Sequence, residues 1–178
     1  SDMLGSLSEA VATVRAKDNG SRKGGKVSTK PSDEMAKQMM NAAIEAAERA
    51  YVPYSNFPVG AAVLTAEGTI VTGCNVENAS YPVTNCAERV AIGTAVAAGS
   101  RIIQAVAVYA PQIETVTPCG ACRQVINEFK PADDELWMIF NSADGPFLVP
   151  FSEILPRAFG PRDLQDWGSG PPEWSPSE

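Results

Sequence analysis

The sequence predicts an α/β fold, a three-layer α/β/α sandwich built on a five-stranded mixed sheet. Helical and strand-like segments alternate along the chain in the order α-β-β-α-β-α-β-β-α. Two pairs of consecutive strands are separated only by short turns that contain glycine. Helices that connect strands of one sheet cross over it and pack on its faces, whereas short turns make antiparallel hairpins. The sheet is therefore expected to contain both parallel and antiparallel strand pairs.

The first half of this fold is predicted to hold one helix and one hairpin. Ser32 can cap a helix whose apolar residues recur at helical spacing as far as Tyr51, where Pro53 ends it. The segments 60–65 and 69–74 are short, apolar and joined by a tight turn, which is typical of a hairpin. A helix is thus expected on one face of the first two strands.

The second half is predicted to alternate strands and helices. The expected elements are a helix from Cys86 to Gly99, a strand at 102–110, a helix from Cys119 to Phe129, a hairpin formed by 136–140 and 147–151, and a short final helix capped by Ser152. Cys86 and Cys119 each begin a helix that follows a strand. In such crossovers the strand ends face a common crevice, so the two helix N-termini are expected to meet.

Composition indicates one globular domain between two extensions. The chain has 178 residues, of which 44% are hydrophobic and 20% charged. Residues 32–164 are expected to form the domain, 1–31 a flexible N-terminal extension and 165–178 a flexible C-terminal tail. Residues 1–30 carry six Lys/Arg against three Asp/Glu, which leaves the rest of the chain with a charge of −10. So acidic a body repels phosphate backbones, which argues against nucleic acid as a partner. No membrane-spanning or targeting segment is recognised, so a cytoplasmic protein is expected.

Three cysteines and one acid form the candidate catalytic group. Cys86, Cys119 and Cys122 supply thiols, and Cys119 and Cys122 lie one helical turn apart. Three thiolates leave the fourth tetrahedral position of a zinc ion open, as catalytic sites require. Because the chain contains no histidine, Glu88 is the candidate proton carrier. This spacing resembles the signature of zinc nucleobase deaminases, with Cys86 in the place of a histidine.

Two other arrangements of the four cysteines are considered. They could form two disulfides, since their number is even. Alternatively Cys74 could be the fourth ligand of a closed structural zinc site. Both are disfavoured by the spacing, and Cys74 is expected to be a small core residue at the end of a strand.

The motifs of the chain resemble those of the small homotetrameric zinc-dependent cytidine deaminases. The resemblance extends from about Tyr51 to Leu164. Its motifs are Tyr54-Ser55-x-Phe57-Pro58-Val59-Gly60, Gly73-Cys74-Asn75-Val76-Glu77-Asn78-Ala79, Cys86-Ala87-Glu88-Arg89, Pro118-Cys119-Gly120-Ala121-Cys122-Arg123-Gln124-Val125 and Leu155-Pro156-x-x-Phe159-Gly160-Pro161. Thr84 and Asn85, just before Cys86, are polar where many relatives carry Gly and a hydrophobic residue.

The resemblance implies the function and the roles of individual residues. It implies hydrolytic deamination of cytidine and 2′-deoxycytidine in pyrimidine salvage, by a zinc-activated water with Glu88 as proton shuttle. The implied zinc ligands are Cys86, Cys119 and Cys122; the implied substrate-binding residues are Phe57, Asn75, Glu77, Ala87, Tyr81 and Phe159, the last two reaching a neighbouring subunit's pocket in a homotetramer. Arg89 is expected to donate to ligand sulfurs and offset the charge of the third thiolate, although a surface ion pair is its plainer role.

Two other functions are compatible with the same motifs. One is a deaminase of a nucleoside analogue or another aminopyrimidine with the same fold. The other is a zinc-stabilised binding module without catalysis, in which Glu88 would have no purpose. Ammonia release from cytidine, measured with and without a chelator, distinguishes the three.

Overall fold

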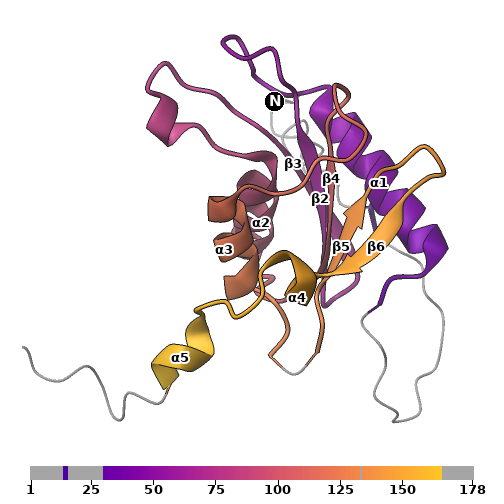
Figure 1. Ribbon diagram of the computed structural model, residues 1–178, viewed down its shortest axis with the longest axis vertical. Helices are drawn as coiled ribbons and strands as arrows, with labels where there is room; N and C mark the ends of the chain where they lie inside the picture. Colours follow the sequence, from indigo (N-terminus) through magenta and orange to yellow (C-terminus); the bar gives the residue numbers. More distant parts are fainter. Residues whose placement is uncertain (1–13, 16–29, 133, 166–178) are drawn as a thin grey trace, which may run out of the picture.

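The computed structural model describes residues 14–15, 30–132 and 134–165 and contains one mixed sheet in these residues (Figure 1). The sheet has the strand order β1-β3-β2-β4-β5-β6. Its strands are β1 (Val14–Arg15), β2 (Gly60–Thr65), β3 (Thr69–Cys74), β4 (Ile103–Tyr109), β5 (Trp137–Phe140) and β6 (Phe147–Pro150). Neighbouring strands are antiparallel except β4 and β5, which are parallel. The five predicted strands and the mixed character of the sheet are confirmed.

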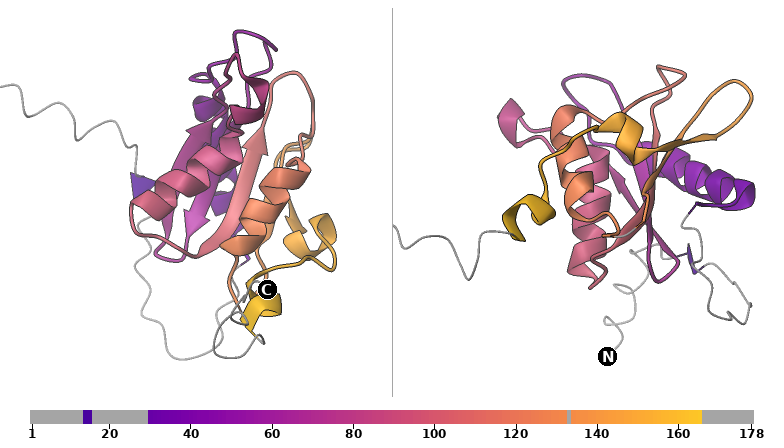
Figure 2. Two further views of the ribbon diagram at one scale, coloured as in Figure 1. Left: turned by 90° about the vertical axis from the view of Figure 1, so that its left-hand side faces the viewer. Right: turned by 60° about the horizontal axis from the view of Figure 1, so that its bottom comes forward.

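Helices cover both faces of the sheet and complete three layers (Figures 1 and 2). The helices are α1 (Asp33–Ala47), the 3-10 turn η1 (Tyr81–Val83), α2 (Ala87–Ala97), α3 (Gly120–Glu128), α4 (Phe151–Ile154) and α5 (Pro161–Gln165). α1 lies on one face, and α2 and α3 lie side by side on the other. Each of these two helices connects a strand to a later strand that runs parallel to it, β3 to β4 and β4 to β5. The predicted α/β/α sandwich is therefore correct.

The central strands are buried on both faces, which explains why their sequences are apolar without interruption. Along β2, Ala61 and Val63 face the core beneath α2 and α3, whereas Ala62 and Leu64 face the core beneath α1. Met39 of α1 fills the second core and is fully buried. The two cores hold the helices at fixed positions on the sheet.

Two glycines let helices approach the sheet closely. A Cβ built on Gly60 of β2 would stand 1.9 Å from the carbonyl oxygen of Ala43 in α1. A Cβ on Gly73 of β3 would stand 2.4 Å from the backbone nitrogen of Ala91 and 2.7 Å from the carbonyl oxygen of Ala87. Only glycine permits these contacts. The contact at Gly73 brings the first turns of α2 against the end of β3.

Several predicted boundaries differ from the structure. α1 ends at Ala47, with Glu48 as its C-cap, and does not continue to Tyr51. The backbone of Tyr51 instead forms an isolated bridge with Val76 in the segment after β3. Ser152 lies inside α4, which begins at Phe151. Hydrogen bonds to distant parts of the chain determine where these helices begin and end, and the spacing of apolar residues in the sequence does not reveal such bonds.

The two ends of the chain were predicted to be extensions and lie mostly outside the described residues. Within the N-terminal segment the structure describes β1, which pairs antiparallel with the edge of β3. This short strand was not predicted. At the other end, α5 runs to Gln165, one residue past the predicted domain boundary.

Candidate functional site

The three predicted ligand thiols lie together. Cys86 and Cys119 are the N-cap residues of α2 and α3, and Cys122 lies in the first turn of α3. The sulfur atoms of all three lie within 4.8 Å of one another. Neither Cys86 nor Cys119 uses its side chain for a capping hydrogen bond. The prediction that two helix N-termini would meet here is confirmed, and the thiols are available for a metal.

The geometry of this cluster fits a zinc ion. Zinc–thiolate bonds of about 2.3 Å in a tetrahedron place neighbouring sulfurs about 3.8 Å apart. The Sγ atoms of Cys86 and Cys119 are 4.0 Å apart. In the described part of the chain, these three thiols form the one group of side chains that could hold a metal ion. Three protein ligands leave one tetrahedral position for water or substrate.

The environment of the cluster favours thiolate at Cys86. A hydrogen bond from the Cys122 thiol, helped by the guanidinium of Arg89, lowers the pKa of Cys86 to about 5 although burial opposes ionisation. The same hydrogen bond, together with burial, raises the pKa of Cys122. The positive ends of two helix dipoles also favour negative charge on these sulfurs. Of these two thiols, Cys86 is therefore the more readily ionised.

Arg89 lies one helical turn after Cys86 and supports the cluster from the side. Its Nη2 atom donates to the sulfur of Cys86 at 3.9 Å and to the carbonyl oxygen of Thr84. Its Nε atom is buried and has no partner among the described residues. The structure shows contact with one ligand sulfur, so donation to a second sulfur stays a prediction. These contacts are unlike those of a surface ion pair.

Glu88 is buried next to the thiols. Its side chain is 4% exposed and lies in the first turn of α2. Burial raises the pKa of this carboxyl, and the charge of the Cys86 thiolate adds to the effect. Desolvation disfavours the charged form of an acid, so protons bind it more readily than in water. A carboxyl with a raised pKa is suited to taking up and releasing protons near neutral pH.

A pocket of about 160 Å³ opens at the cluster. It is lined by the predicted ligands Cys86 and Cys119, by the acid Glu88, and by the predicted substrate-binding residues Asn75 and Ala87. Cys122 is fully buried behind them. The structure thus brings an acid, two thiols and part of the predicted substrate site into one cavity.

A second hollow of about 380 Å³ lies next to this pocket and shares Thr84 with it. Predicted substrate-binding residues Glu77 and Tyr81 line this hollow, together with Tyr54 and Ser55. The rings of Tyr54 and Tyr81 meet edge to face with their centroids 5.9 Å apart. Four of the predicted substrate-binding residues are therefore divided between two adjacent spaces.

Asn75 and Glu77 hold the wall of both spaces. The side chain of Asn75 accepts from the backbone N–H of Val59 at 2.8 Å and donates to the carbonyl of Phe57 at 2.9 Å. The carboxylate of Glu77 accepts from the backbone N–H groups of Tyr54 at 2.9 Å and Ser55 at 3.2 Å. Glu77 is partly exposed, because it faces the open hollow and not the core.

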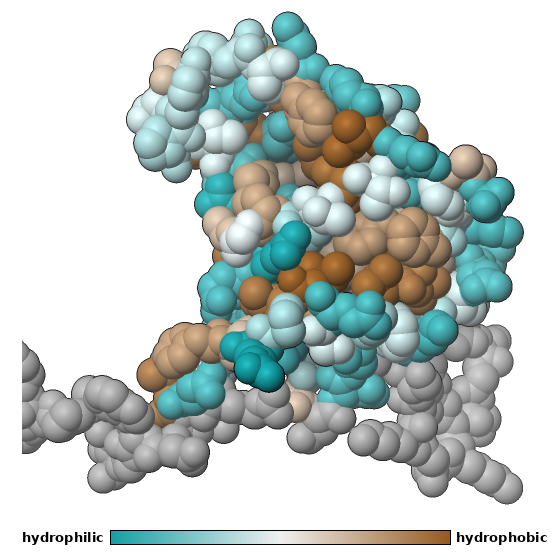
Figure 3. Space-filling model, in the orientation of Figure 1, coloured by the Kyte–Doolittle hydropathy of each residue, from teal (hydrophilic) through white to brown (hydrophobic). Residues whose placement is uncertain are grey.

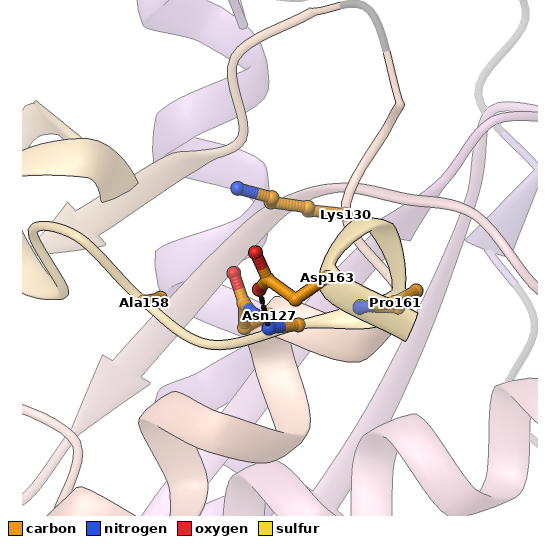
Figure 4. Close-up of a pocket in the computed structure, with 6 residues that line it drawn as sticks. Asn127, Lys130, Ala158, Pro161 and Asp163 are labelled. Atoms are coloured by element: carbon orange, nitrogen blue, oxygen red, sulfur yellow. Dashed lines mark hydrogen bonds between the residues drawn. The ribbon is translucent and has the colours of Figure 1, made fainter. Parts of the chain in front are cut away.

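Two predicted substrate-binding aromatics do not line either space. Phe57 is half-buried in the wall held by Asn75. Phe159 is 63% exposed, and its carbonyl oxygen accepts hydrogen bonds from Gln124 and Asn127 of α3. That contact lies beside a small pocket of about 70 Å³ near α5, in which the buried Asn127 is drawn with Lys130 and Asp163 (Figure 4). The structure does not bring Phe159 to the pocket of its own chain.

Thr84 is the main wall residue that the sequence did not assign to the site. It lines both spaces, its carbonyl accepts from Arg89, and its hydroxyl accepts from the backbone N–H of Asn78. Val59, Val116 and Thr117 complete the smaller pocket. The position of Thr84, two residues before Cys86, was the available signal for its role.

The other arrangements of the cysteines receive no support. All four cysteines are free thiols. Cys74 is half-buried, and its thiol donates to the carbonyl of Arg49 at 3.4 Å; it is not part of the three-thiol group. It is thus a residue at the margin of the core rather than inside it. In the described part of the chain, no helix combines the length and apolar character needed to cross a bilayer.

Comparison with known proteins gives consistent matches. Residues 33–135 match a family model described as the cytidine and deoxycytidylate deaminase zinc-binding region. The chain is 47% identical over 134 residues to the cytidine deaminase of Halalkalibacterium halodurans, which covers 74% of this chain and 100% of that protein. It is 48% identical over 120 residues to the cytidine deaminase of Sporosarcina psychrophila, covering 67% and 88% of the two chains. The crystal structure of cytidine deaminase from Burkholderia pseudomallei superimposes with a TM-score of 0.62 and 43% identity over 68% of this chain and 97% of that one.

Proposed function

Because the chain belongs to the cytidine and deoxycytidylate deaminase family, we propose that it hydrolyses cytidine and 2′-deoxycytidine to uridine and 2′-deoxyuridine and releases ammonia. The observation that carries this proposal is the position of Glu88, a buried acid in one pocket with the thiols of Cys86 and Cys119. Relatives that are 47% identical to the chain over 134 residues and 48% identical over 120 residues are named cytidine deaminases. Free nucleosides also suit the acidic body of the chain better than nucleotides or polymers.

The three thiols would hold the zinc ion, which when bound lowers the pKa of a water molecule and so supplies a nucleophile at neutral pH. Glu88 accepts a proton from the attacking water and delivers it to N3 of the pyrimidine. As the oxygen bonds to C4, the double bond between N3 and C4 becomes single. Glu88 then takes the remaining proton of the new C4 hydroxyl and gives it to the amino nitrogen, and as the double bond from C4 to oxygen forms, the bond from C4 to nitrogen breaks and ammonia leaves. The raised pKa of Glu88 supports this double role because the group must both accept and give up a proton. Arg89 offsets negative charge at the sulfurs.

The substrate would occupy both spaces, with the base in the smaller pocket and the ribose toward the hollow lined by Glu77. Ala87 and Asn75 line the smaller pocket and Glu77 lines the hollow, which supports the proposal that Ala87 borders the base and that Asn75 and Glu77 bind the ribose 3′-hydroxyl. A carboxylate accepts from a free hydroxyl and repels a phosphate, so nucleosides are preferred over nucleotides. Phe57, which is half-buried in the wall held by Asn75, is proposed to pack against the base.

The active form is proposed to be a homotetramer whose pockets are completed by neighbouring subunits. Tyr81 is 71% exposed and Phe159 63% exposed, so both rings are accessible to a neighbouring subunit. Figure 3 shows hydrophobic residues gathered between hydrophilic ones on one face of the subunit. In the tetramer Phe159 would reach the pocket of another copy, as would Tyr81, whose ring lines the hollow of its own chain in this structure.

The remaining proposals concern the extent and setting of the protein. The deaminase domain is proposed to comprise residues 32–164. A cytoplasmic role in pyrimidine salvage is proposed from the nature of the substrate, a free nucleoside.

Ammonia release from cytidine tests the function directly. The purified chain should release one ammonia per uridine formed, and a chelator should abolish this activity until zinc is returned. A chain that deaminates only nucleoside analogues would support the same fold with another substrate. A chain that binds zinc but releases no ammonia from any nucleoside in a panel would be a zinc-stabilised binding module. Such a module would not explain why Glu88 is buried beside the thiols.

A further inference from the structure

Arg123 lies in the first turn of α3, beside Cys122, and joins two separate segments of the chain. Its Nε atom donates to the carbonyl oxygen of Pro118 at 2.8 Å, and Nη1 donates to the carbonyl oxygen of Ile154 at 3.0 Å. Ile154 is the last residue of α4, where carbonyl groups lack partners within the helix. One half-buried guanidinium therefore connects the loop before α3 to the end of α4.

The Pro118 carbonyl belongs to the peptide group that leads into Cys119. The proline ring restricts rotation on one side of Pro118, and the hydrogen bond from Arg123 holds the carbonyl on the other. Because the peptide group is planar, a fixed carbonyl fixes the direction of the next N–H as well. Cys119 follows as the N-cap of α3 with φ −65° and ψ 167°. The direction in which its thiol leaves the backbone thus depends on the group that Arg123 holds.

Cys119 depends on this restraint more than the other two thiols do. Cys122 is fully buried, so packing holds its side chain. Cys86 is half-buried and contacts Arg89. Cys119 is exposed and its thiol makes no capping bond. Apart from the 4.0 Å contact with the sulfur of Cys86, its position is therefore set by the backbone that carries it.

Charge does not account for the placement of Arg123. The guanidinium that faces the cluster is that of Arg89, which lies 3.9 Å from the sulfur of Cys86. Both hydrogen bonds of Arg123 end on neutral backbone carbonyls. Its contribution is the fork of two donors that holds two carbonyls at once.

We propose that Arg123 is a positioning residue for the metal site, which holds the Pro118 carbonyl so that the Cys119 thiol faces Cys86 and Cys122. The proposal rests on the zinc site of the proposed function. Outer partners that orient metal ligands are commonly worth about 10–100-fold in metal affinity. A loss of that size is expected when the fork of Arg123 is removed.

Gln124 provides a matched control. Its side-chain amide donates to the carbonyl oxygen of Phe159 at 2.8 Å, so it also ties α3 to the segment after α4. It makes no hydrogen bond to Pro118 in the described residues. Loss of Gln124 removes a contact to the C-terminal segment but leaves the peptide group before Cys119 held.

The test compares zinc affinity with stability in the full chain. The zinc dissociation constant is measured by competition with a chromophoric chelator for the unaltered chain and for R123K, R123A and Q124A, and the thermal unfolding midpoint is measured for each metal-free chain. We expect R123K and R123A to bind zinc about 10–100-fold more weakly, because a lysine ammonium cannot reproduce the two-donor fork. Q124A should change zinc affinity less than about threefold, whatever its unfolding midpoint.

Each outcome decides a different question. If R123K binds zinc as tightly as the unaltered chain, or if Q124A weakens binding as much as R123A, the positioning role is overturned. The same holds if the Arg123 variants lose only stability. R123K retains most of the side-chain volume, so the test does not depend on R123A folding. If the unaltered chain binds no zinc, the proposed function itself fails; if it binds zinc and releases ammonia while all variants bind zinc equally, only this inference fails.

Discussion

The Sγ atoms of Cys86 and Cys119 lie 4.0 Å apart, although 33 positions separate the two residues in the chain. Substitution C119A removes one of the three thiolates that the proposed zinc site requires. Zinc affinity should then fall by more than the roughly 10–100-fold typical of outer partners, and activity should be lost. Metal content measured after dialysis checks this, and C74A, which alters a thiol outside the cluster, should keep one zinc per chain.

Zinc affinity should fall as pH falls. Thiols must lose their protons to bind metal, so acid competes with zinc. The pKa of Cys86 is lowered to about 5, so this thiol loses its proton readily at neutral pH. The pKa of Cys122 is raised, so zinc must displace its proton. The apparent affinity should drop about tenfold per pH unit for each proton displaced. Titration at several pH values measures the slope, and a pH-independent affinity would contradict three thiol ligands.

Glu88 should be needed for chemistry and not for metal binding. E88Q keeps the shape of the side chain but cannot carry a proton, so activity should fall by at least about a thousandfold while zinc content stays unchanged. E128Q is the control, since Glu128 is exposed at the end of α3. Turnover of cytidine by E88Q at even a tenth of the unaltered rate would exclude Glu88 as the proton carrier.

Gly73 should be irreplaceable by alanine at the contact between β3 and α2. The added Cβ would meet the backbone of Ala91 at 2.4 Å, and backbone cannot move aside as a side chain can. The free energy of unfolding of G73A should fall by about 1–3 kcal/mol or more, as measured by urea denaturation of the metal-free chain. G93A is a contrasting variant, because nothing lies within 4 Å of a Cβ there and alanine favours the helix. Equal stability of G73A and the unaltered chain would contradict the close approach.

Glu77 should affect substrate affinity through the wall that it holds. Its carboxylate accepts two backbone hydrogen bonds, and E77A removes both, so KM for cytidine should rise roughly tenfold, with a smaller rise for E77Q, whose amide oxygen still accepts. Zinc content should not change.

The hydroxyl of Ser55 lowers the pKa of Glu77 from its ordinary value of 4.5, so the carboxylate persists at neutral pH and its hold on the wall is lost only as pH falls below that value. The KM ratio of E77Q to the unaltered chain should therefore be constant between about pH 6 and 8.

The sequence was sufficient to predict the fold and the metal cluster because both depend on local signals. Uninterrupted apolar strands and helices that begin at Cys86 and Cys119 imply the crossovers, and the crossovers bring the thiols together. The end of α1 and the strand β1 were missed, because they depend on hydrogen bonds to β3 and to the segment after it that no local pattern reveals. The same is true of the bonds from Asn75 and Glu77 to the wall at 54–59, which exist only in the folded chain.

The shared pocket can be tested by combining two inactive chains. F159A should lose most activity while keeping zinc, because its exposed ring is proposed to complete the pocket of a neighbour. E88Q should also be inactive, but it still supplies Phe159. Joint unfolding and refolding of the two variants in equal amounts would place an intact Glu88 beside an intact Phe159 from the neighbouring subunit in about a quarter of the sites, if the copies assemble at random. Activity per chain, measured by ammonia release from cytidine, should recover to about a quarter of that of the unaltered chain, whereas each variant refolded alone stays inactive. Full activity of F159A, or mixed tetramers without recovered activity, would show that each chain completes its own pocket.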